Sequence, residues 1–264
     1  MLSNAHESAG GLAWQIVTRL GEAQLLLPAM AATVLWLVLR RDAWRLALCW
    51  LLATGAAASL TTASKVAFIG YGVGYAPWDF TGFSGHAMFA AAVLPVMCRL
   101  AEGSLPERWH GHGLAFGYAL AALVAASRVP VLAHSWSEAL SGYALGAMAS
   151  AVTLWAAQAP RLRFSPWLLG ALALGLSLGV AQAPPSRTHD MVTRLSLALS
   201  RRPQPYTRLQ MHRDFRRQHL QTVQIQAAQQ AAQRQASCQA SGTAPGGSAS
   251  KPTCSITRTP WFSS

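Results

Sequence analysis

The sequence predicts an all-α fold: a bundle of six transmembrane helices followed by a flexible basic C-terminal tail. Composition is the first reason, because 52% of the 264 residues are hydrophobic and only 11% are charged. An ordinary soluble domain carries about 25% charged residues. The second reason is a series of apolar stretches that approach the roughly 20 residues with which a helix crosses a bilayer. The third is that arginine-rich and arginine-poor connections alternate between these stretches.

The apolar stretches cover residues 23–39, 43–63, 86–100, 113–127, 138–158 and 166–183. Several are shorter than a straight crossing needs, so we expect local thinning of the bilayer or burial of helix ends among their neighbours. Helices in lipid associate by close backbone approach through small residues. Three predicted spans carry a glycine pair with the required spacing: Gly113 with Gly117, Gly142 with Gly146, and Gly175 with Gly179. These pairs favour a packed bundle.

Loop charge predicts the orientation. The first, third and fifth connections between spans carry Arg40, Arg41, Arg45, Arg99, Arg108, Arg161 and Arg163. Short positively charged loops face the cytoplasm, so the opposite connections and both termini are expected outside. For a bacterial-type inner (plasma) membrane, this multi-pass arrangement turns the outer edge of the bundle toward the periplasm.

The regions on either side of the bundle differ from it in composition. We divide the chain into an N-terminal interfacial segment (1–22), the six-span membrane domain (23–183), a basic amphipathic tail (184–220) and a low-complexity, disordered tail (221–264). Residues 184–264 hold eleven Lys or Arg against two Asp, which is nine of the twelve net positive charges. Because these charges follow apolar spans, anionic lipid headgroups are the expected partner, and nucleic acid is not.

Five ionisable residues lie at the ends of predicted spans, where charge is costly and usually functional. All five fall on the outer side: Lys65, His86, Arg128, His134 and Glu138. Singly, each has a structural explanation, since a lysine or arginine at a helix end often serves only as a membrane anchor. Together they predict a site at that edge.

The same residues resemble the type 2 phosphatidic acid phosphatases, whose site is shared with glucose-6-phosphatase-like and vanadium haloperoxidase enzymes. That family has a Lys with Arg-Pro seven positions on, then Pro-Ser-Gly-His, then Ser-Arg-x5-His-x3-Asp. In this chain the third block is Ser127-Arg128, His134 and Glu138, and the second is Phe83 to His86. Lys65 begins the first block. The resemblance covers residues 65–138 and implies the membrane phosphatase branch.

Four positions depart from the family pattern. Gly72-Val73 stands where the family has Arg-Pro, Phe83 replaces the Pro of the second block, and Glu138 replaces the final Asp. The last change keeps the carboxylate. The loss of the first-block arginine implies weaker phosphate binding, a substrate of smaller charge, or a substitute cation, since one hydrogen bond to a charged group contributes about 1.5–3 kcal/mol.

Phosphoryl transfer depends on positioned donors around the equatorial oxygens. We expect Lys65 and Arg128 to supply positive charge, and Ser84 with Gly85 to form a phosphate cradle before the third span. His134 and Glu138 are four residues apart, so the carboxylate can hold one imidazole nitrogen and leave the other to attack phosphorus. His86 is then the general acid and later the base. This chemistry requires no metal and no cofactor.

These expectations define a function and its rivals. The first is an integral membrane lipid-phosphate phosphatase that hydrolyses a phosphomonoester or pyrophosphate lipid through a phosphohistidine. The second is a phosphotransferase that passes the phosphoryl group to a lipid or sugar acceptor at the same site. The third is a catalytically degenerate member that only binds lipid or serves as a scaffold. The expected partners are the lipid phosphate substrate and membrane lipids.

Overall fold

The computed structural model describes residues 13–40, 43–104, 106–157 and 188–242, together with the isolated positions Gly11 and Gly175. The chain divides into two units, residues 1–211 and residues 212–264. The first unit contains the helix bundle and every site residue expected from the sequence. The second contains most of one long helix.

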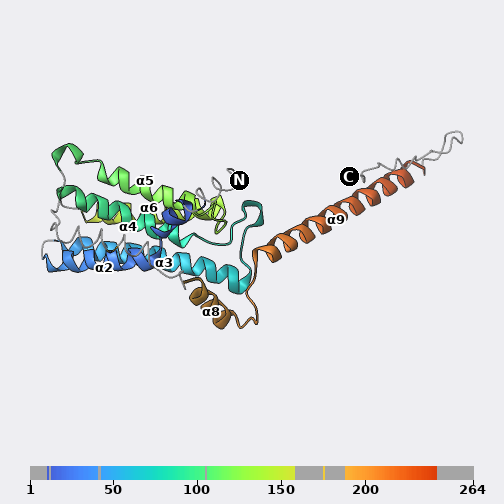
Figure 1. Cartoon of the computed structure of the whole chain (residues 1–264). Coiled ribbons are helices and arrows are strands. Elements are labelled where there is room, and N and C mark those ends of the chain that lie inside the picture. The colour runs from blue at the N-terminus through green and yellow to red at the C-terminus, as the bar shows by residue number, and fades with distance from the viewer. Residues whose placement is uncertain are drawn as a thin grey trace, which may run out of the picture. The chain divides into compact units, whose positions relative to one another are not determined.

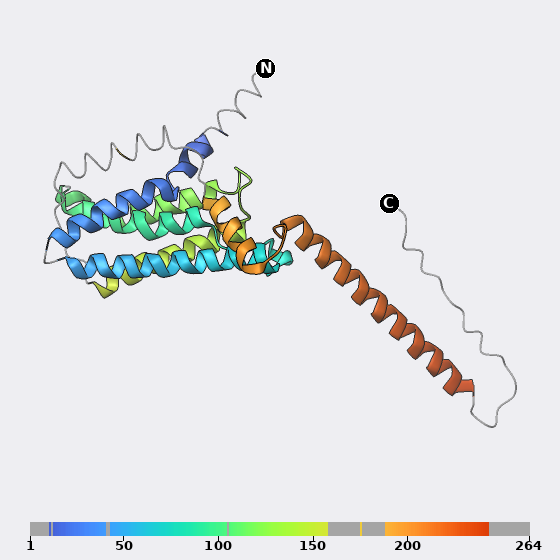
Figure 2. The same ribbon diagram turned by 90° about the horizontal axis from the view of Figure 1, so that it is seen from below.

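Five helices form the bundle: α2 (Ala23–Leu39), α3 (Trp44–Tyr71), α4 (Gly85–Ala101), α5 (Gly113–Ser127) and α6 (Trp136–Ala156). Figures 1 and 2 show them running side by side. Helix α4 packs most extensively, against α5 and α6 and also against α2 and α3. An almost continuous apolar run of α4 is therefore fully buried, including Ala90 and Val96. The regular elements in the described part of the chain are helices.

Four of the described helical stretches are long and apolar enough to cross a membrane: Ala13–Leu39, Trp44–Tyr71, Gly85–Ser104 and Trp136–Ala156. Helix α5 is also apolar, but it has only 15 residues, and a helix that short needs a thinned bilayer or buried ends. Of the six predicted spans, the one at 166–183 lies outside the described residues except for Gly175. The structure thus supports four crossings, and the remaining two stay predictions.

Glycines bring the helices of the bundle into backbone contact. A Cβ on Gly146 of α6 would lie 2.1 Å from the carbonyl oxygen of Met88, and one on Gly117 of α5 would lie 2.5 Å from Cα of Pro95. Any larger side chain would push α6 or α5 away from α4, as expected for helices that pack through small residues. The same close approach occurs at Gly113 and Gly142. Gly179 lies outside the described residues.

Helix α3 is longer than the sequence predicted. The predicted span ended at residue 63, before Lys65, but the helix continues to Tyr71 and ends at Gly72, whose φ of 75° is left-handed. Glycine adopts this conformation without a steric cost, which makes it a common helix terminator. Lys65 therefore projects from within α3, where a cavity receives its side chain.

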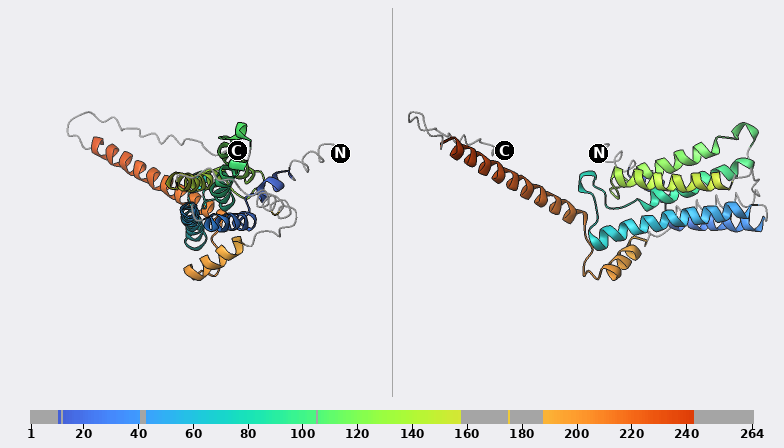
Figure 3. Two further views of the ribbon diagram at one scale, coloured as in Figure 1. Left: turned by 90° about the vertical axis from the view of Figure 1, so that its left-hand side faces the viewer. Right: turned by 180° about the vertical axis from the view of Figure 1, so that it is seen from behind.

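The chain returns to the bundle after residue 188. Helix α8 (Thr188–Ser200) packs on α3 with Val192 and Ser196 buried, and Figure 3 shows the two helices side by side. This helix lies within the region 184–220 that the sequence analysis assigned to a basic amphipathic tail. A short extended stretch follows, in which the Tyr206 amide donates to the carbonyl oxygen of Ile69 at 2.9 Å. Part of the predicted basic tail is therefore packed against the membrane domain.

Helix α9 (Arg208–Gly242) differs from the expectation for the tail. We expected disordered chain from residue 221, yet the described residues up to 242 are helical. The run is rich in Gln and Ala and contains neither Pro nor Gly before Gly242, so its intrinsic helix propensity is high. The low sequence complexity correctly indicated a polar, exposed segment, but it did not predict that the backbone is helical.

Candidate active site

The loop from α5 to α6 presents the proposed nucleophile. Helix α6 begins with a capping box, in which the Ser135 side chain accepts from the Glu138 amide and the Glu138 carboxylate accepts from the Ser135 amide. This cap satisfies amide groups that a helix start leaves unpaired. It also places Glu138 in the first helical turn and His134 just before the helix. We expected both residues within one helix, but His134 lies in the loop.

His134 and Glu138 form a close pair. The distance from Nδ1 of His134 to Oε2 of Glu138 is 2.7 Å. A carboxylate accepts hydrogen bonds and does not donate them, so the proton of this bond belongs on Nδ1. The other ring nitrogen, Nε2, is then the atom with a free lone pair. This is the arrangement expected of an imidazole nucleophile held by a carboxylate.

Glu138 is fully buried and receives donors from several directions. The Thr81 amide donates to Oε1 at 2.7 Å, and the Thr81 hydroxyl donates to the same oxygen. The Ser135 amide donates to Oε2 at 3.2 Å. Arg208 donates from Nη2 to both oxygens, at 2.8 Å and 2.9 Å. A buried carboxylate needs such donors to remain charged, and these also fix its orientation.

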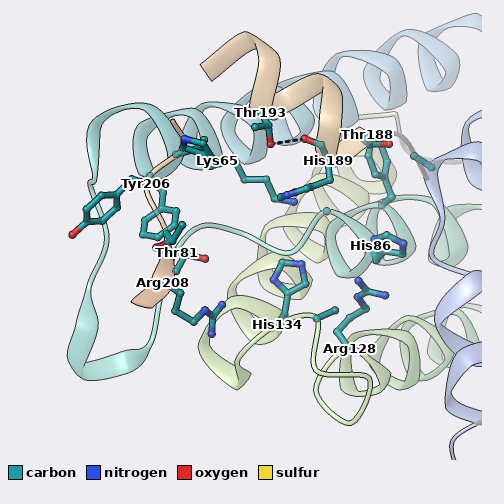
Figure 4. A pocket seen from close by; sticks show the side chains of 18 residues that line it. Lys65, Thr81, His86, Arg128, His134, Thr188, His189, Thr193, Tyr206 and Arg208 are labelled. Atoms are coloured by element: carbon teal, nitrogen blue, oxygen red, sulfur yellow. Dashed lines mark hydrogen bonds between the residues drawn. The ribbon is translucent and has the colours of Figure 1, made fainter. Parts of the chain in front are cut away.

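A cavity of about 600 Å³ lies beside this pair. The predicted residues that line it are Lys65, Gly85, His86, Arg128 and His134. Figure 4 shows the side chains of Lys65, His86, Arg128 and His134, which come from α3, α4, the end of α5 and the loop before α6. The structure thus brings together residues from three separate blocks of the sequence. Positive groups and two imidazoles face one space, which suits an anionic substrate.

Arg128 follows the last residue of α5 and is 9% exposed. Its Nη1 donates to the Thr18 hydroxyl at 2.8 Å, so the N-terminal helical stretch holds one end of the guanidinium. Its Nε has no hydrogen-bond partner among the described residues. An unpaired buried donor that borders a cavity is available to an anionic ligand.

The predicted phosphate cradle is only partly exposed to the cavity. Gly85 lines it, and a Cβ there would meet nothing within 4 Å. Ser84, the residue before α4, is fully buried, and its amide donates to the carbonyl oxygen of Glu138 at 3.1 Å. That amide is therefore not free for phosphate. His86 follows in the first turn of α4, where helix amides favour an anion.

Burial alters the ionisation of the two site residues outside the spans. It lowers the pKa of His134 below its ordinary value of 6.5, and the positive charge of Lys65 lowers it further, while the hydrogen bond to Glu138 opposes both effects. The imidazole is consequently neutral near pH 7, as a nucleophile must be. Burial also lowers the pKa of Arg128, against the attraction of Glu22, but an arginine remains protonated at neutral pH.

Several residues near the site escaped the sequence analysis. Thr81 lies three residues before the expected phosphate cradle at Ser84 and Gly85, and it binds Glu138. Tyr206 and Arg208 come from the tail and line the cavity. The Ser135–Glu138 spacing is a sequence signature of a capping box and was the one available signal for the start of α6. Nothing local distinguishes Arg208 from the other basic residues of the tail.

Metal binding was tested against the same geometry. Among the residues that the structure describes, no group of three or more His, Cys, Asp or Glu side chains is placed to share a metal ion. The cations and imidazoles that line the cavity are Lys65, Arg128, Arg208, His86, His134 and His189.

Comparison with known proteins places this arrangement in a family. The model of the PAP2 superfamily matches residues 61–162, which include all the predicted site residues. The chain is 39% identical over 141 residues to a protein of Klebsiella pneumoniae described as an uncharacterized 22.5 kDa protein in cps region, an alignment that covers 53% of this chain and 68% of that protein. No solved structure matches. The matched segment contains every site residue predicted from the sequence, and this chain belongs to the PAP2 superfamily.

Proposed function

We propose that the chain is an integral membrane lipid-phosphate phosphatase that hydrolyses a phosphomonoester or pyrophosphate lipid through a phosphohistidine on His134. Membership of the PAP2 superfamily suggests phosphatase-type chemistry. One observation supports the mechanism most strongly: His134 is held through Nδ1 by buried Glu138 at 2.7 Å, in a cavity that Lys65 and Arg128 also line.

In the first step, Nε2 of His134 attacks phosphorus and the bond to the leaving oxygen breaks. Lys65 and Arg128 stabilise the charge on the equatorial oxygens. Glu138 stabilises the positive charge that the imidazole gains when the N–P bond forms. The position of Lys65, Arg128 and His134 around the cavity, with Glu138 bound to His134, supports these proposed roles.

His86 is the proposed proton carrier. It gives a proton to the leaving oxygen, and then takes one from the water that attacks the phosphohistidine, which releases inorganic phosphate and free His134. An imidazole can serve in both directions because its ring nitrogens can donate or accept a proton. His86 and His134 line the same cavity (Figure 4).

Two features support a lipid as the substrate. Helices long enough to span a membrane carry the site, so a substrate anchored in the bilayer reaches it by lateral diffusion. An open apolar groove of about 620 Å³ also lies between α3 and α8, with Ala58, Thr62, Val66, Leu195 and Leu199 among its lining residues. The groove is suited to an acyl or isoprenoid chain.

Phosphate release from a panel of lipid phosphates and lipid pyrophosphates, by the full chain purified in detergent, tests the proposal. We expect release by the wild-type protein and loss of at least about a thousandfold in His134→Ala, as found when a nucleophile is removed. His219→Ala, which changes an exposed histidine of α9, is the matched control. Release that persists in His134→Ala would contradict the phosphohistidine.

The same assay separates the alternatives. Phosphate that appears on an added lipid or sugar acceptor, instead of in solution, would identify a phosphotransferase. No turnover of any substrate with or without acceptor, together with binding of lipid phosphate, would identify a degenerate binding protein.

We also propose that the site faces the periplasm of a bacterial-type inner membrane. Leu132, in the loop between α5 and α6, is 92% exposed. In a chain without its native cysteines, Leu132→Cys should react with an impermeant thiol reagent in intact spheroplasts, whereas Trp109→Cys on the α4–α5 connection should react only after lysis. The reverse labelling pattern would invert the orientation.

A further inference from the structure

Arg208 joins the site from far along the sequence. It is the first residue of α9 and lies 70 positions after Glu138, yet its Nη2 binds both carboxylate oxygens at 2.8 Å and 2.9 Å. Its Nη1 binds the carboxylate of Asp79. All three residues belong to the first compact unit, residues 1–211, so this is an internal contact of that unit.

The chain before Arg208 is fixed to the bundle. The Tyr206 amide donates to the carbonyl oxygen of Ile69 at 2.9 Å, and the Tyr206 ring packs edge-on against Phe68 with 5.5 Å between centroids. The Thr207 amide donates to the Gln210 side chain at 2.8 Å, which caps the start of α9. These contacts fix the backbone before and after Arg208. The guanidinium is therefore held at the backbone by these contacts and at its nitrogens by the two carboxylates.

Gly72 lies directly against the tail segment. A Cβ there would meet the Tyr206 ring at 3.5 Å, which is an ordinary van der Waals contact. This is the position at which the sequence lacks the expected first-block arginine. The chain therefore has no cation at position 72. Instead, the segment that carries Arg208 packs against Gly72.

Charge explains what Arg208 does there. Glu138 is fully buried, and with neutral His134 the pair would leave one net negative charge away from water. Such a charge is costly unless it is paired and hydrogen-bonded. Arg208 supplies the opposite charge in the bidentate geometry that an arginine offers to a carboxylate.

We propose that Arg208 is a positioning residue for the nucleophile: it holds the buried Glu138 carboxylate charged and oriented, so that Nδ1 of His134 keeps its proton and Nε2 faces the substrate. The inference rests on the proposed function. It assigns the segment 205–208 to the active site and makes the post-bundle tail a working part of the enzyme.

The geometry distinguishes this role from direct phosphate binding. Both terminal nitrogens of Arg208 are engaged by carboxylates, Nη2 by Glu138 and Nη1 by Asp79. A phosphate ligand in the same position would have to compete with two carboxylates. Substrate binding therefore falls to Lys65 and Arg128, and the effect of Arg208 passes through Glu138 to His134.

Steady-state kinetics of the full chain in detergent test the proposal. For Arg208→Gln we expect kcat to fall at least about tenfold while KM stays within about twofold. The acid limb of the kcat/KM profile should move to higher pH, because an unneutralised carboxylate stabilises the protonated imidazole more. Arg208→Lys should recover part of kcat, since it restores the charge but not the fork. Arg217→Gln, at an exposed position of α9, should match the wild type.

Two kinetic results would overturn the inference. Wild-type kcat in Arg208→Gln would show that the contact is dispensable. A large increase in KM with an unshifted acid limb would show that Arg208 binds substrate instead. A misfolded variant is recognised by its thermal denaturation and size-exclusion profile, and Arg208→Lys then serves as the informative variant.

A readout that needs no turnover separates this inference from the proposed function. In protein labelled with ¹⁵N-histidine, with the resonance assigned by His134→Gln, we expect the Nδ1–H tautomer of His134 in the wild type and a mixed or titrated ring at the same pH in Arg208→Gln. An unchanged spectrum would overturn the positioning role even if the wild type is active. If the wild-type protein has no phosphatase activity but the Nδ1–H tautomer is still lost in Arg208→Gln, the positioning role stands and only the phosphatase proposal is rejected.

Discussion

The end of α5 and the start of α9 each bring one arginine to the same cavity, and the two are held in opposite ways. Arg128 is buried, is tied at Nη1 to the Thr18 hydroxyl, and keeps Nε without a partner among the described residues. Arg208 is more exposed, and both of its terminal nitrogens bind carboxylates. Both line the cavity, but among the described residues Arg128 contributes a buried nitrogen without a partner, whereas the two terminal nitrogens of Arg208 are bound by carboxylates.

This difference separates two uses of the same side chain. A guanidinium with a spare donor can gain a hydrogen bond when an anionic substrate arrives, and so contributes to binding and to the transition state. A guanidinium already neutralised by carboxylates organises those carboxylates. Distance to the cavity alone would have assigned both arginines to the substrate, whereas the hydrogen-bond partners assign them different roles.

Among the changes that test the comparison of the two arginines, substitution of Arg128 should give the largest effect. In Arg128→Gln we expect kcat/KM to fall by about 100-fold, since removal of one preorganised donor to a developing negative charge costs about 10²–10³ in rate. Part of the loss should be in KM, in contrast to Arg208→Gln. Arg108→Gln on the α4–α5 connection serves as control. A loss confined to kcat would erase the distinction between the two arginines.

The pH profile tests the electrostatic side of the comparison. Burial and the neighbouring charges lower the pKa of His134 below its ordinary value of 6.5, so the neutral nucleophile persists into mildly acidic solution. We expect the acid limb of kcat/KM for the wild type to lie below pH 6.5, with activity falling about tenfold per pH unit beneath it. A limb above pH 7 would mean that the carboxylate dominates and that the imidazole is protonated in the resting site.

Thr18 tests how firmly Arg128 is held. Thr18→Val removes the hydroxyl that accepts from Arg128 at 2.8 Å and changes the shape of the side chain little. A hydrogen bond to a charged group contributes about 1.5–3 kcal/mol, but solvent or substrate can replace this acceptor, so we expect KM to rise by only about three- to tenfold. Unchanged kinetics would show that burial alone positions Arg128.

The smallest effect is expected at the groove between α3 and α8. Leu199 lines it and is 57% exposed. In Leu199→Gln we expect the preference for a long-chain over a short-chain lipid phosphate to fall by about threefold, since one buried CH₂ contributes only about 0.8 kcal/mol. The measurement is kcat/KM for the two substrates. An equal fractional loss of kcat/KM for both substrates would show that the substitution acts through the Arg208 segment, which follows α8, and not through contact with the lipid chain.

The helices of the bundle were largely predictable because lipid imposes a simple pattern. The bounds of α2 and α5 agree with the apolar stretches at 23–39 and 113–127. Helix α3 was predicted too short, because a lysine was taken as the end of a span. A charged residue does not end a helix when a polar cavity receives it, and the cavity at Lys65 is a tertiary feature that hydropathy does not contain.

The candidate site likewise has a part that the sequence could predict and a part that only the fold specifies. His134 and Glu138 were predictable from local spacing, because residues four positions apart meet near a helix start. The loss of the cation at Gly72 was also visible, together with the need for a substitute. Its identity was not, because Arg208 reaches Glu138 across 70 positions and only the fold specifies such a contact. Asp79 and Glu138 lie far apart in the sequence, and only the fold shows that both bind Arg208.

The separation of Arg208 from Glu138 has a consequence for biosynthesis. A ribosome adds about 5–20 residues per second, so the 70 intervening positions take on the order of ten seconds to make. During that interval the nascent bundle already contains the nucleophile but not the arginine that neutralises its carboxylate. A chain that stops before residue 208 would hold the whole matched segment, residues 61–162, and still lack this contact. On the proposal that Arg208 positions His134, the site is complete only after the tail segment has been made.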